Sequence, residues 1–500
     1  AIEILIKAHE ARSQRDFAFR QLARAEQLNQ LNRFLLTDAS PSNAPIAVGH
    51  LLSRAEEIVN KEDYADHPAD HVGILISIGE QYSARGEVQE SKRVLLQAYA
   101  LAGKLLENGV RARAACSLAV TLDQAGEHAE AEHLIQEGLH ELPEDSSVVL
   151  DRVSCLAQAS EVAIGNGAAR EAISLAQRAQ SALEQSPIQS DNLKLEIMLD
   201  LGQAYALSGQ PAQASAVYER AAGLVSKLGY DETRVAVDVL DAFGFAMHMA
   251  GHPKQAEQIL RRAIDLTKAK GLEDASTPPL LLTYSRILYE LERPKEAEPY
   301  GERALEKARS TGDEVTLEQS MLNLARIYRD EREFDRSEAL LNKVEPLLRR
   351  ELPAGHYAFA KLDNDRALLA AARGDFVTAL RLNNQAIGIM DAALKAGRQS
   401  WAPSLLVDRA GIELALHQPE KAYADVERAF STADLGTGTI SATRGRFYLA
   451  RARALQALGR FPEAKADAQS AIEQLEPTAG SDYPGVIEAQ QIVRSHAQSP

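Results

Sequence analysis

Three arginines and a tyrosine in the second half of the chain have the spacing of side chains that share one face of a helix. Arg286 and Tyr289 are three residues apart, and Arg326 and Arg329 repeat that spacing in a later segment, with Asn323 just before them. Residues three or four apart lie on the same side of a helix. Because a guanidinium binds a carboxylate in a planar, two-pronged way, these residues predict a groove that holds an acidic peptide or protein segment.

A second interpretation gives the same arginines partners inside the chain. Acidic residues follow closely in both segments, at Glu290, Asp330, Glu331 and Glu333. Most charged groups on a helix face are solvated or paired locally. The sequence alone therefore leaves open whether the arginines bind a partner or these carboxylates.

An apolar segment precedes the arginines and contains Phe243, Phe245, Met247 and His248. The spacing assigns Phe243 and Met247 to the core. We expect Phe245 and His248 to face the same groove, where an aromatic side chain often anchors a bound helix or peptide.

Other chemistry has little support in the sequence. His67 and His71 have the i, i+4 spacing of a metal-binding helix, but Pro68 interrupts the helix between them, so a solvated linker is the favoured interpretation. Gly-x-Gly segments lack the following Lys-Ser/Thr of a phosphate-binding loop. We therefore predict no catalytic residue, metal or cofactor in these residues.

The elements that would position the groove are helix pairs, and residues 201–221 show the unit most clearly. Leu201, Gly202 and Tyr205 share a face, Gly209 ends the first helix, and small and aromatic residues recur on the second. The same pattern recurs every 40–43 residues, which gives ten helix pairs in the same register. The small residue that anchors each copy stands at positions 79, 119, 160, 202, 244, 285, 325, 367, 410 and 452.

This order of small, aromatic and glycine positions resembles the tetratricopeptide repeat, although the period is longer than the usual 34 residues. The resemblance implies an all-α fold, a right-handed superhelical α-solenoid of about ten helix-turn-helix repeats. Since one pair cannot bury its apolar face alone, stacked copies form a continuous core and leave an inner face for binding.

Composition fits an interaction module. The net charge of −16 disfavours nucleic acid as a partner, because phosphate binding needs a basic face. Cys116 and Cys155 fall on the first helices of neighbouring repeats and are interpreted as small core residues, with no disulfide framework indicated. No apolar run approaches the length of a membrane span, so a membrane is expected only through a preceding segment.

Four segments organise the chain. An amphipathic connector helix is expected at residues 1–36, a linker with a capping helix at 37–71, the solenoid at 72–475, and a tail at 476–500 whose last helix would cap the array. The first segment is locally basic, and it could cover the first repeat or act as a juxtamembrane or coiled-coil connector. Because the chain begins at Ala1, it is expected to be a fragment of a longer protein.

Several segments resemble the region that follows the kinase domain in bacterial serine/threonine protein kinases with long tetratricopeptide extensions. They are residues 21–42, 48–56, 251–263, 345–346, 352–356 and 445–455. The resemblance implies a non-catalytic scaffold on the cytoplasmic side or on the extracytoplasmic face of a single-pass membrane kinase. The alternative is the sensory arm of a transcriptional regulator that binds a small ligand or a partner. The sequence does not fix the partner or the oligomeric state.

Overall fold

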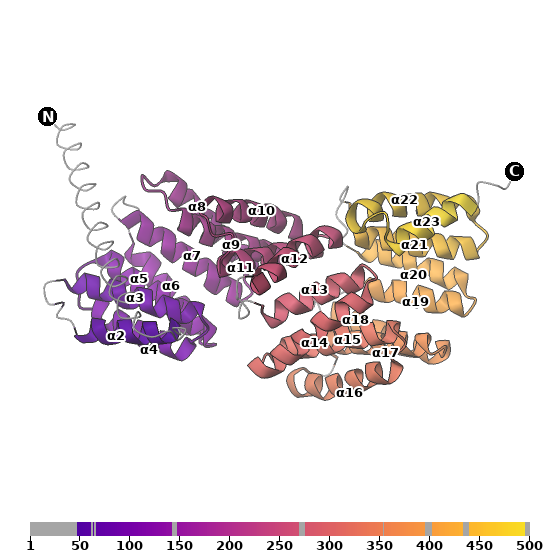
Figure 1. Cartoon of the computed structure of the whole chain (residues 1–500), viewed down its shortest axis with the longest axis horizontal. Coiled ribbons are helices and arrows are strands. Elements are labelled where there is room, and N and C mark those ends of the chain that lie inside the picture. The colour runs from indigo at the N-terminus through magenta and orange to yellow at the C-terminus, as the bar shows by residue number, and fades with distance from the viewer. Residues whose placement is uncertain are drawn as a thin grey trace. The chain divides into compact units, whose positions relative to one another are not determined.

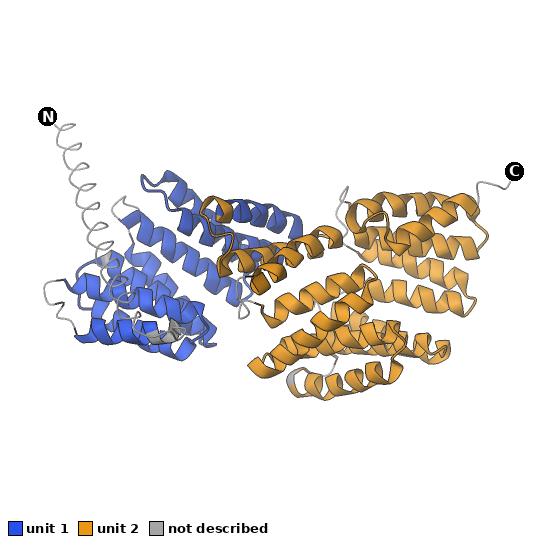
Figure 2. Cartoon of the chain, viewed as in Figure 1, with its two compact units in different colours: residues 1–224 blue, residues 225–500 orange. Residues whose placement is uncertain are grey.

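The computed structural model describes residues 48–61, 64, 67–142, 148–269, 276–353, 355–395, 403–433 and 440–495. The secondary-structure elements of these residues are helices. The chain divides into two compact units, residues 1–224 and 225–500 (Figures 1 and 2). The division falls inside one helix of the predicted array. The connector expected at 1–36 and the turn segment after it lie outside the described residues. Among the described helices, none is long and apolar enough to cross a bilayer.

The first unit begins with a single helix, α2, and continues as helix pairs. Its helices are α2 Val48–Lys61, α3 Pro68–Ala84, α4 Val88–Ala102, α5 Asn108–Gln124, α6 His128–Glu141, α7 Val149–Gly165, α8 Ala169–Gln185, α9 Asp191–Leu207 and α10 Pro211–Lys227, the last of which spans the boundary between the units.

The second unit holds six further pairs and one terminal helix. They are α11 Arg234–Met249, α12 Pro253–Ala269, α13 Pro278–Glu290, α14 Pro294–Thr311, α15 Glu314–Asp330, α16 Phe334–Glu351, α17 Tyr357–Ala372, α18 Phe376–Lys395, α19 Ser404–Ala415, α20 Pro419–Thr432, α21 Ala442–Ala457, α22 Phe461–Ala479 and α23 Pro484–Ser495.

The turns confirm the predicted register of ten repeats. The residue seven positions after each anchor adopts a positive φ, at 71–84° for seven glycines and 58–64° for three other residues. A left-handed residue at this position ends the first helix and directs the chain into the second. The ten residues are Gly86, Gly126, Gly167, Gly209, Gly251, Glu292, Arg332, Gly374, His417 and Gly459.

The anchors are small because the two helices of a pair touch there. A Cβ added to Gly202 would lie 2.6 Å from ring carbons of Tyr218, and one added to Gly244 would lie 2.4 Å from Leu260. Both partner side chains stand sixteen residues after their anchor. In the repeat whose anchor is Ser160, the partner position 176 is alanine. The larger side chain is then on the first helix and the smaller one on the second, so the two helices can still pack closely.

The two cysteines differ from the sequence prediction. Both are buried as expected, Cys116 on α5 and Cys155 on α7, but the structure joins them in a disulfide with their Cα atoms 5.4 Å apart. Cys116 stands three residues before the anchor at 119 and Cys155 five before the anchor at 160, so the packing of α5 on α7 brings together positions that differ by two in the repeat register. The bond ties two helices of the inner layer in the first unit.

The second unit brings its first and last pairs into contact. The Gly251 carbonyl, in the α11–α12 turn, accepts a 2.9 Å hydrogen bond from the Ala442 amide at the start of α21, and α12 packs on α22. One apolar cluster includes buried side chains from α11 to α13 and from α21 to α23. The inner helices of this unit therefore share an interior, and the predicted arginines lie there.

Candidate functional site

The second unit collects all seven predicted groove residues on three neighbouring inner helices. Phe245 and His248 lie on α11, Arg286 and Tyr289 on α13, and Asn323, Arg326 and Arg329 on α15. Helix α13 packs against both α11 and α15. The repeat register thus predicted the neighbourhood, but the structure gives each side chain a different role.

Arg326 already binds a carboxylate of the chain. Its Nε and Nη2 donate to the two carboxylate oxygens of Asp365 on α17, at 2.7 and 3.0 Å. Asp365 is buried, and its charge raises the pKa of Arg326. Arg326 therefore follows the second interpretation, in which the arginines pair with carboxylates of the chain. The sequence analysis did not name Asp365 because this residue lies in the next repeat.

Arg329 and Tyr289 form a closed group with Asp330. The Arg329 guanidinium donates to Asp330 Oδ1 and to the Tyr289 hydroxyl, both at 2.7 Å, and that hydroxyl donates to Asp330 Oδ2 at 2.8 Å. Burial raises the pKa of Tyr289, so the phenol stays protonated. Asp330 was among the proposed local partners, and the structure shows that it engages Arg329.

Asn323 and His248 are not surface residues. Asn323 is 2% exposed and donates from Nδ2 to the Ser285 hydroxyl at 2.8 Å, because its position two residues before the anchor points toward the anchor of the preceding pair. The His248 side chain is 10% exposed, its Nδ1 lies 3.5 Å from Glu290 Oε2, and burial lowers its pKa. Of the predicted apolar pair, only Phe245 is exposed, at 41%.

Arg286 is the cation of this group that has no hydrogen-bonded or ion-paired carboxylate among the described residues. Among the described residues it makes no hydrogen bond and no ion pair within 4 Å, and burial followed by repulsion from Arg326 lowers its pKa. Lys361, on α17, is a second cation without such a contact; its side chain is exposed, and partial desolvation followed by repulsion from Arg286 and Arg326 lowers its pKa. Lys361 lies over the ring of Tyr357, 5.0 Å from its centroid. The sequence analysis missed Lys361 because this residue stands six positions before its anchor, and the analysis considered positions one and four after each anchor and Asn323 two before.

The acidic groups of the same interior are engaged elsewhere. Burial opposes ionisation of Glu290, but Arg446 on α21, His248 and Arg286 together hold its pKa below the ordinary value. Glu290 on α13 lies 3.9 Å from Arg446 and thus joins the second and last pairs of this unit. Asp408 accepts a 2.8 Å hydrogen bond from Asn364. Arg286 and Lys361 therefore remain as the cations of this set that form no hydrogen bond or ion pair with a described carboxylate.

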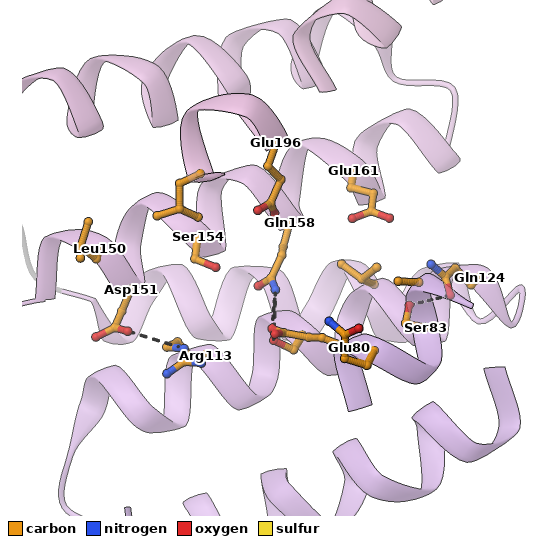
Figure 3. A pocket seen from close by; sticks show the side chains of 15 residues that line it. Glu80, Ser83, Arg113, Gln124, Leu150, Asp151, Ser154, Gln158, Glu161 and Glu196 are labelled. Carbon is orange, nitrogen blue, oxygen red and sulfur yellow. Dashed lines mark hydrogen bonds and ion pairs between the residues drawn. The ribbon is translucent and has the colours of Figure 1, made fainter. Parts of the chain in front are cut away.

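The first unit contains a pocket of about 520 Å³ that the sequence analysis did not predict (Figure 3). It crosses the inner helices α3, α5, α7 and α9, and Glu80, Asp151, Glu161 and Glu196 line it together with a single cation, Arg113. Two of these acids stand directly after an anchor, at positions 80 and 161, which is the signal that the sequence offered.

The histidines considered for a metal site are separated by the start of a helix. His67 precedes α3, Pro68 is its first residue, and His71 stacks on Tyr64 with ring centroids 4.6 Å apart. Within the part of the chain that the structure describes, no group of three or more His, Cys, Asp or Glu is arranged to hold a metal ion.

Comparison with known proteins agrees with this geometry. The tetratricopeptide repeat family matches residues 195–220 and 445–466, in the fourth and tenth helix pairs. The chain thus contains tetratricopeptide repeats in an α-solenoid fold, the fold of protein-interaction scaffolds. No curated protein matches the chain.

Among solved structures, the Rap protein complexed with competence and sporulation factor is similar over 73% of this chain and 97% of its own, with 14% identity and a TM-score of 0.52. A tetratricopeptide repeat protein from Parabacteroides merdae matches over 60% and 97%, with 14% identity and a TM-score of 0.39. Yeast Tom70 matches over 85% and 96%, with 13% identity and a TM-score of 0.37. At these identities the Rap likeness concerns the fold alone.

Proposed function

We propose that the chain is a protein-interaction module whose second unit binds an acidic segment of a partner protein at Arg286 and Lys361. The observation that carries this proposal is that Arg286 forms no hydrogen bond or ion pair with a described carboxylate. A guanidinium that is withdrawn from water without a partner costs free energy. A ligand carboxylate removes that cost through two charge-assisted hydrogen bonds.

The repeat register explains why Arg286 is unpaired. Arg326 stands one residue after its anchor, and Asp365 stands two residues before the next anchor. Arg286 occupies the same position as Arg326 one repeat earlier, and Asn323 occupies the position of Asp365. An amide that bonds Ser285 takes the place of the carboxylate, so Arg286 has no counterpart of the Arg326–Asp365 pair, and a ligand carboxylate can supply it.

Apolar side chains on the neighbouring helix add area for a partner. Phe245 and Met249, one turn apart on α11, are 41% and 57% exposed. His248 lies between them in sequence and lies against Glu290 of α13, so this edge of α11 is continuous with the arginine-bearing helix. An acidic segment with an apolar residue would use both surfaces, because apolar anchors supply most of the affinity at such interfaces.

We further propose that the chain is attached to a serine/threonine kinase. This part of the proposal rests on the segments that resemble the region after the kinase domain, such as residues 48–56 at the start of the described residues. The placement on the cytoplasmic side or beyond a membrane helix rests on the same resemblance. Determination of the coding sequence upstream of Ala1 tests this part. A kinase catalytic loop there supports it, whereas a nucleotide-binding or DNA-binding domain would favour the transcriptional regulator instead.

The binding proposal is tested by selecting a displayed library of random twelve-residue peptides on the full chain. We expect enrichment of Asp and Glu that is lost in Arg286→Ala/Lys361→Ala. A matched control is Arg303→Ala/Lys343→Ala, which removes two exposed cations from the outer helices α14 and α16. Arg326 and Arg329 are unsuitable for this test because they hold structural carboxylates.

A second variant separates binding from folding. Asn323→Asp places a carboxylate where Asp365 stands opposite Arg326, so Arg286 should acquire an internal partner. We expect the enriched acidic peptides to bind roughly tenfold more weakly, since one close charge pair contributes on the order of 1–2 kcal/mol. Unchanged acidic enrichment in both variants, with circular dichroism showing intact helices, would overturn the proposal.

A further inference from the structure

The pocket of the first unit differs from the arginine site in both place and charge. It is formed by side chains of α3, α5, α7 and α9, all within the first unit, and has a volume of about 520 Å³ (Figure 3). Binding pockets for ligands of moderate size commonly have volumes of about 300–1,000 Å³. The pocket is thus large enough to receive a side chain and part of the backbone of a ligand.

Negative charge in the pocket exceeds the positive charge that could offset it. Four carboxylates face one guanidinium, Arg113, whose Nε lies 3.6 Å from Asp151. Glu196 makes no hydrogen bond or ion pair with any described residue. The Glu196 side chain is exposed, and its partial desolvation, then repulsion from Glu80 and Glu161, raises its pKa to about 7. A cation in the pocket would relieve this repulsion.

The floor of the pocket around Gln158 presents hydrogen-bond acceptors, because the donors of Gln158 and Ser117 are already used. Gln158 is only 8% exposed, and its amide nitrogen donates to the Ser117 hydroxyl at 3.0 Å and to Glu80 at 3.3 Å (Figure 3). Its carbonyl oxygen receives no hydrogen bond from the residues that the structure describes. Ser117 donates to Glu80 at 2.7 Å, so its hydroxyl hydrogen is used as well. A complementary ligand must bring several donors.

The pocket walls distinguish an organic cation from a metal ion. The pocket is lined beside the carboxylates by the apolar side chains of Val120, Leu150 and Leu193. A hydrated metal ion binds oxygen ligands and gains nothing from contact with apolar side chains. The arginine side chain combines an apolar stem with five N–H donors in a rigid fork. It therefore matches the apolar wall, the net charge and the acceptor-rich floor together.

The arrangement of the helices favours a peptide over a compact molecule. Four successive inner helices, each roughly 8–10 Å from the next, form a surface about 25–30 Å long. An extended chain of about eight residues covers that length at about 3.3 Å per residue. Ser83 and Gln124, which bond each other at 2.9 Å near one end of the pocket, can exchange that bond for backbone groups of a peptide (Figure 3).

We propose that the pocket of the first unit binds an arginine side chain of an extended basic peptide segment, with Glu80 and Glu196 holding the guanidinium and Gln158 accepting a hydrogen bond from it. This site goes beyond the proposed function, because it lies in the other unit and selects the opposite charge. The module would then recognise two chemically different segments, on one partner or on two.

The test selects the random twelve-residue peptide library on the full chain and on Glu80→Gln/Glu196→Gln, whose amides preserve shape and remove two charges. A matched control, Glu132→Gln/Glu219→Gln, changes exposed acids on the outer helices α6 and α10 and has the same net charge. We expect arginine enrichment on the parent and the control but not on the pocket variant. An enriched peptide should bind the pocket variant at least tenfold more weakly by fluorescence anisotropy.

Three results would overturn the assignment. They are the absence of arginine enrichment, equal loss in the pocket variant and the control, and equal enrichment of lysine, which lacks the planar fork. The Arg286→Ala/Lys361→Ala variant must keep its arginine-rich peptides while it loses acidic ones. Failure of the acidic selection alone therefore leaves this inference intact, and failure of the arginine selection alone leaves the proposed function intact.

Discussion

Replacing Arg332 with glycine should stabilise the second unit. Arg332 has a φ of 64° in the α15–α16 turn, where seven of the ten repeats have glycine. The left-handed region costs a residue with a Cβ about 1–2 kcal/mol, whereas glycine adopts it freely. Arg332 is exposed, and no hydrogen bond or ion pair of its side chain is found among the described residues, so little is lost with the guanidinium.

The expected net gain is about 1 kcal/mol, because the greater freedom of glycine in the unfolded chain offsets part of the strain that is removed. For a unit of this size that corresponds to roughly 2–4 °C in the midpoint of thermal unfolding. His417, with a φ of 58° and an exposed side chain, should behave in the same way. Circular dichroism at 222 nm and urea unfolding measure both variants.

The reverse change provides the control. Gly374 has a φ of 84°, and a Cβ added to it would meet no atom within 4 Å, so Gly374→Ala changes only the backbone preference. It should destabilise by about 1 kcal/mol. If Arg332→Gly and His417→Gly leave the stability unchanged or lower it while Gly374→Ala also has no effect, turn conformation does not limit the stability of these repeats.

Three other predictions concern packing, the disulfide and pH. Gly202→Ala should destabilise by about 1–3 kcal/mol by pressing on Tyr218, and by the urea midpoint this cost should be smaller in a Tyr218→Ala chain than in the parent. Reduction of Cys116–Cys155, which are 39 residues apart, should cost about 4 kcal/mol, and two free thiols in the unreduced protein would contradict the bond. Burial raises the pKa of Glu413 to about 7, so between about pH 4.5 and 7 this carboxyl keeps its proton in the folded state but loses it in the unfolded state. The free energy of unfolding should therefore fall as pH rises through that range. Glu413→Gln should flatten this pH dependence in thermal unfolding, and an unchanged slope would refute the assignment.

The repeat register could be predicted because it depends on local requirements that a sequence displays. A close contact between paired helices demands a small anchor, as Gly244 against Leu260 shows, and a left-handed turn favours glycine. These two requirements recur at a fixed spacing, so ten weak signals reinforce one another. The three turns without glycine, at Glu292, Arg332 and His417, were still placed because their anchors kept the period.

The site was predicted only in part because its contacts join different repeats. The sequence analysis examined positions one and four residues after each anchor, which identified Arg286 and Arg326. Asp365 stands two residues before its anchor, a position that was considered only at Asn323, and Lys361 stands six before its anchor, a position that was not considered. The pairing of Arg326 with Asp365 depends on how adjacent pairs stack, which the helical period within one segment does not contain.

The same stacking rule accounts for the opposite character of the two candidate sites. The residue after one anchor meets the residue two before the next, as Arg326 meets Asp365 and as Glu80 accepts a hydrogen bond from Ser117. In the first unit the rule sets Glu161 opposite Asp200, and burial followed by repulsion from Glu161 raises the pKa of Asp200 well above its ordinary value. Where opposite charges meet, the charges are satisfied within the chain and stabilise the stack. Where these two positions hold like charges, or a charge and an amide, a charged side chain on the inner face has no oppositely charged partner at the facing position. Such a side chain is available to a ligand of opposite charge.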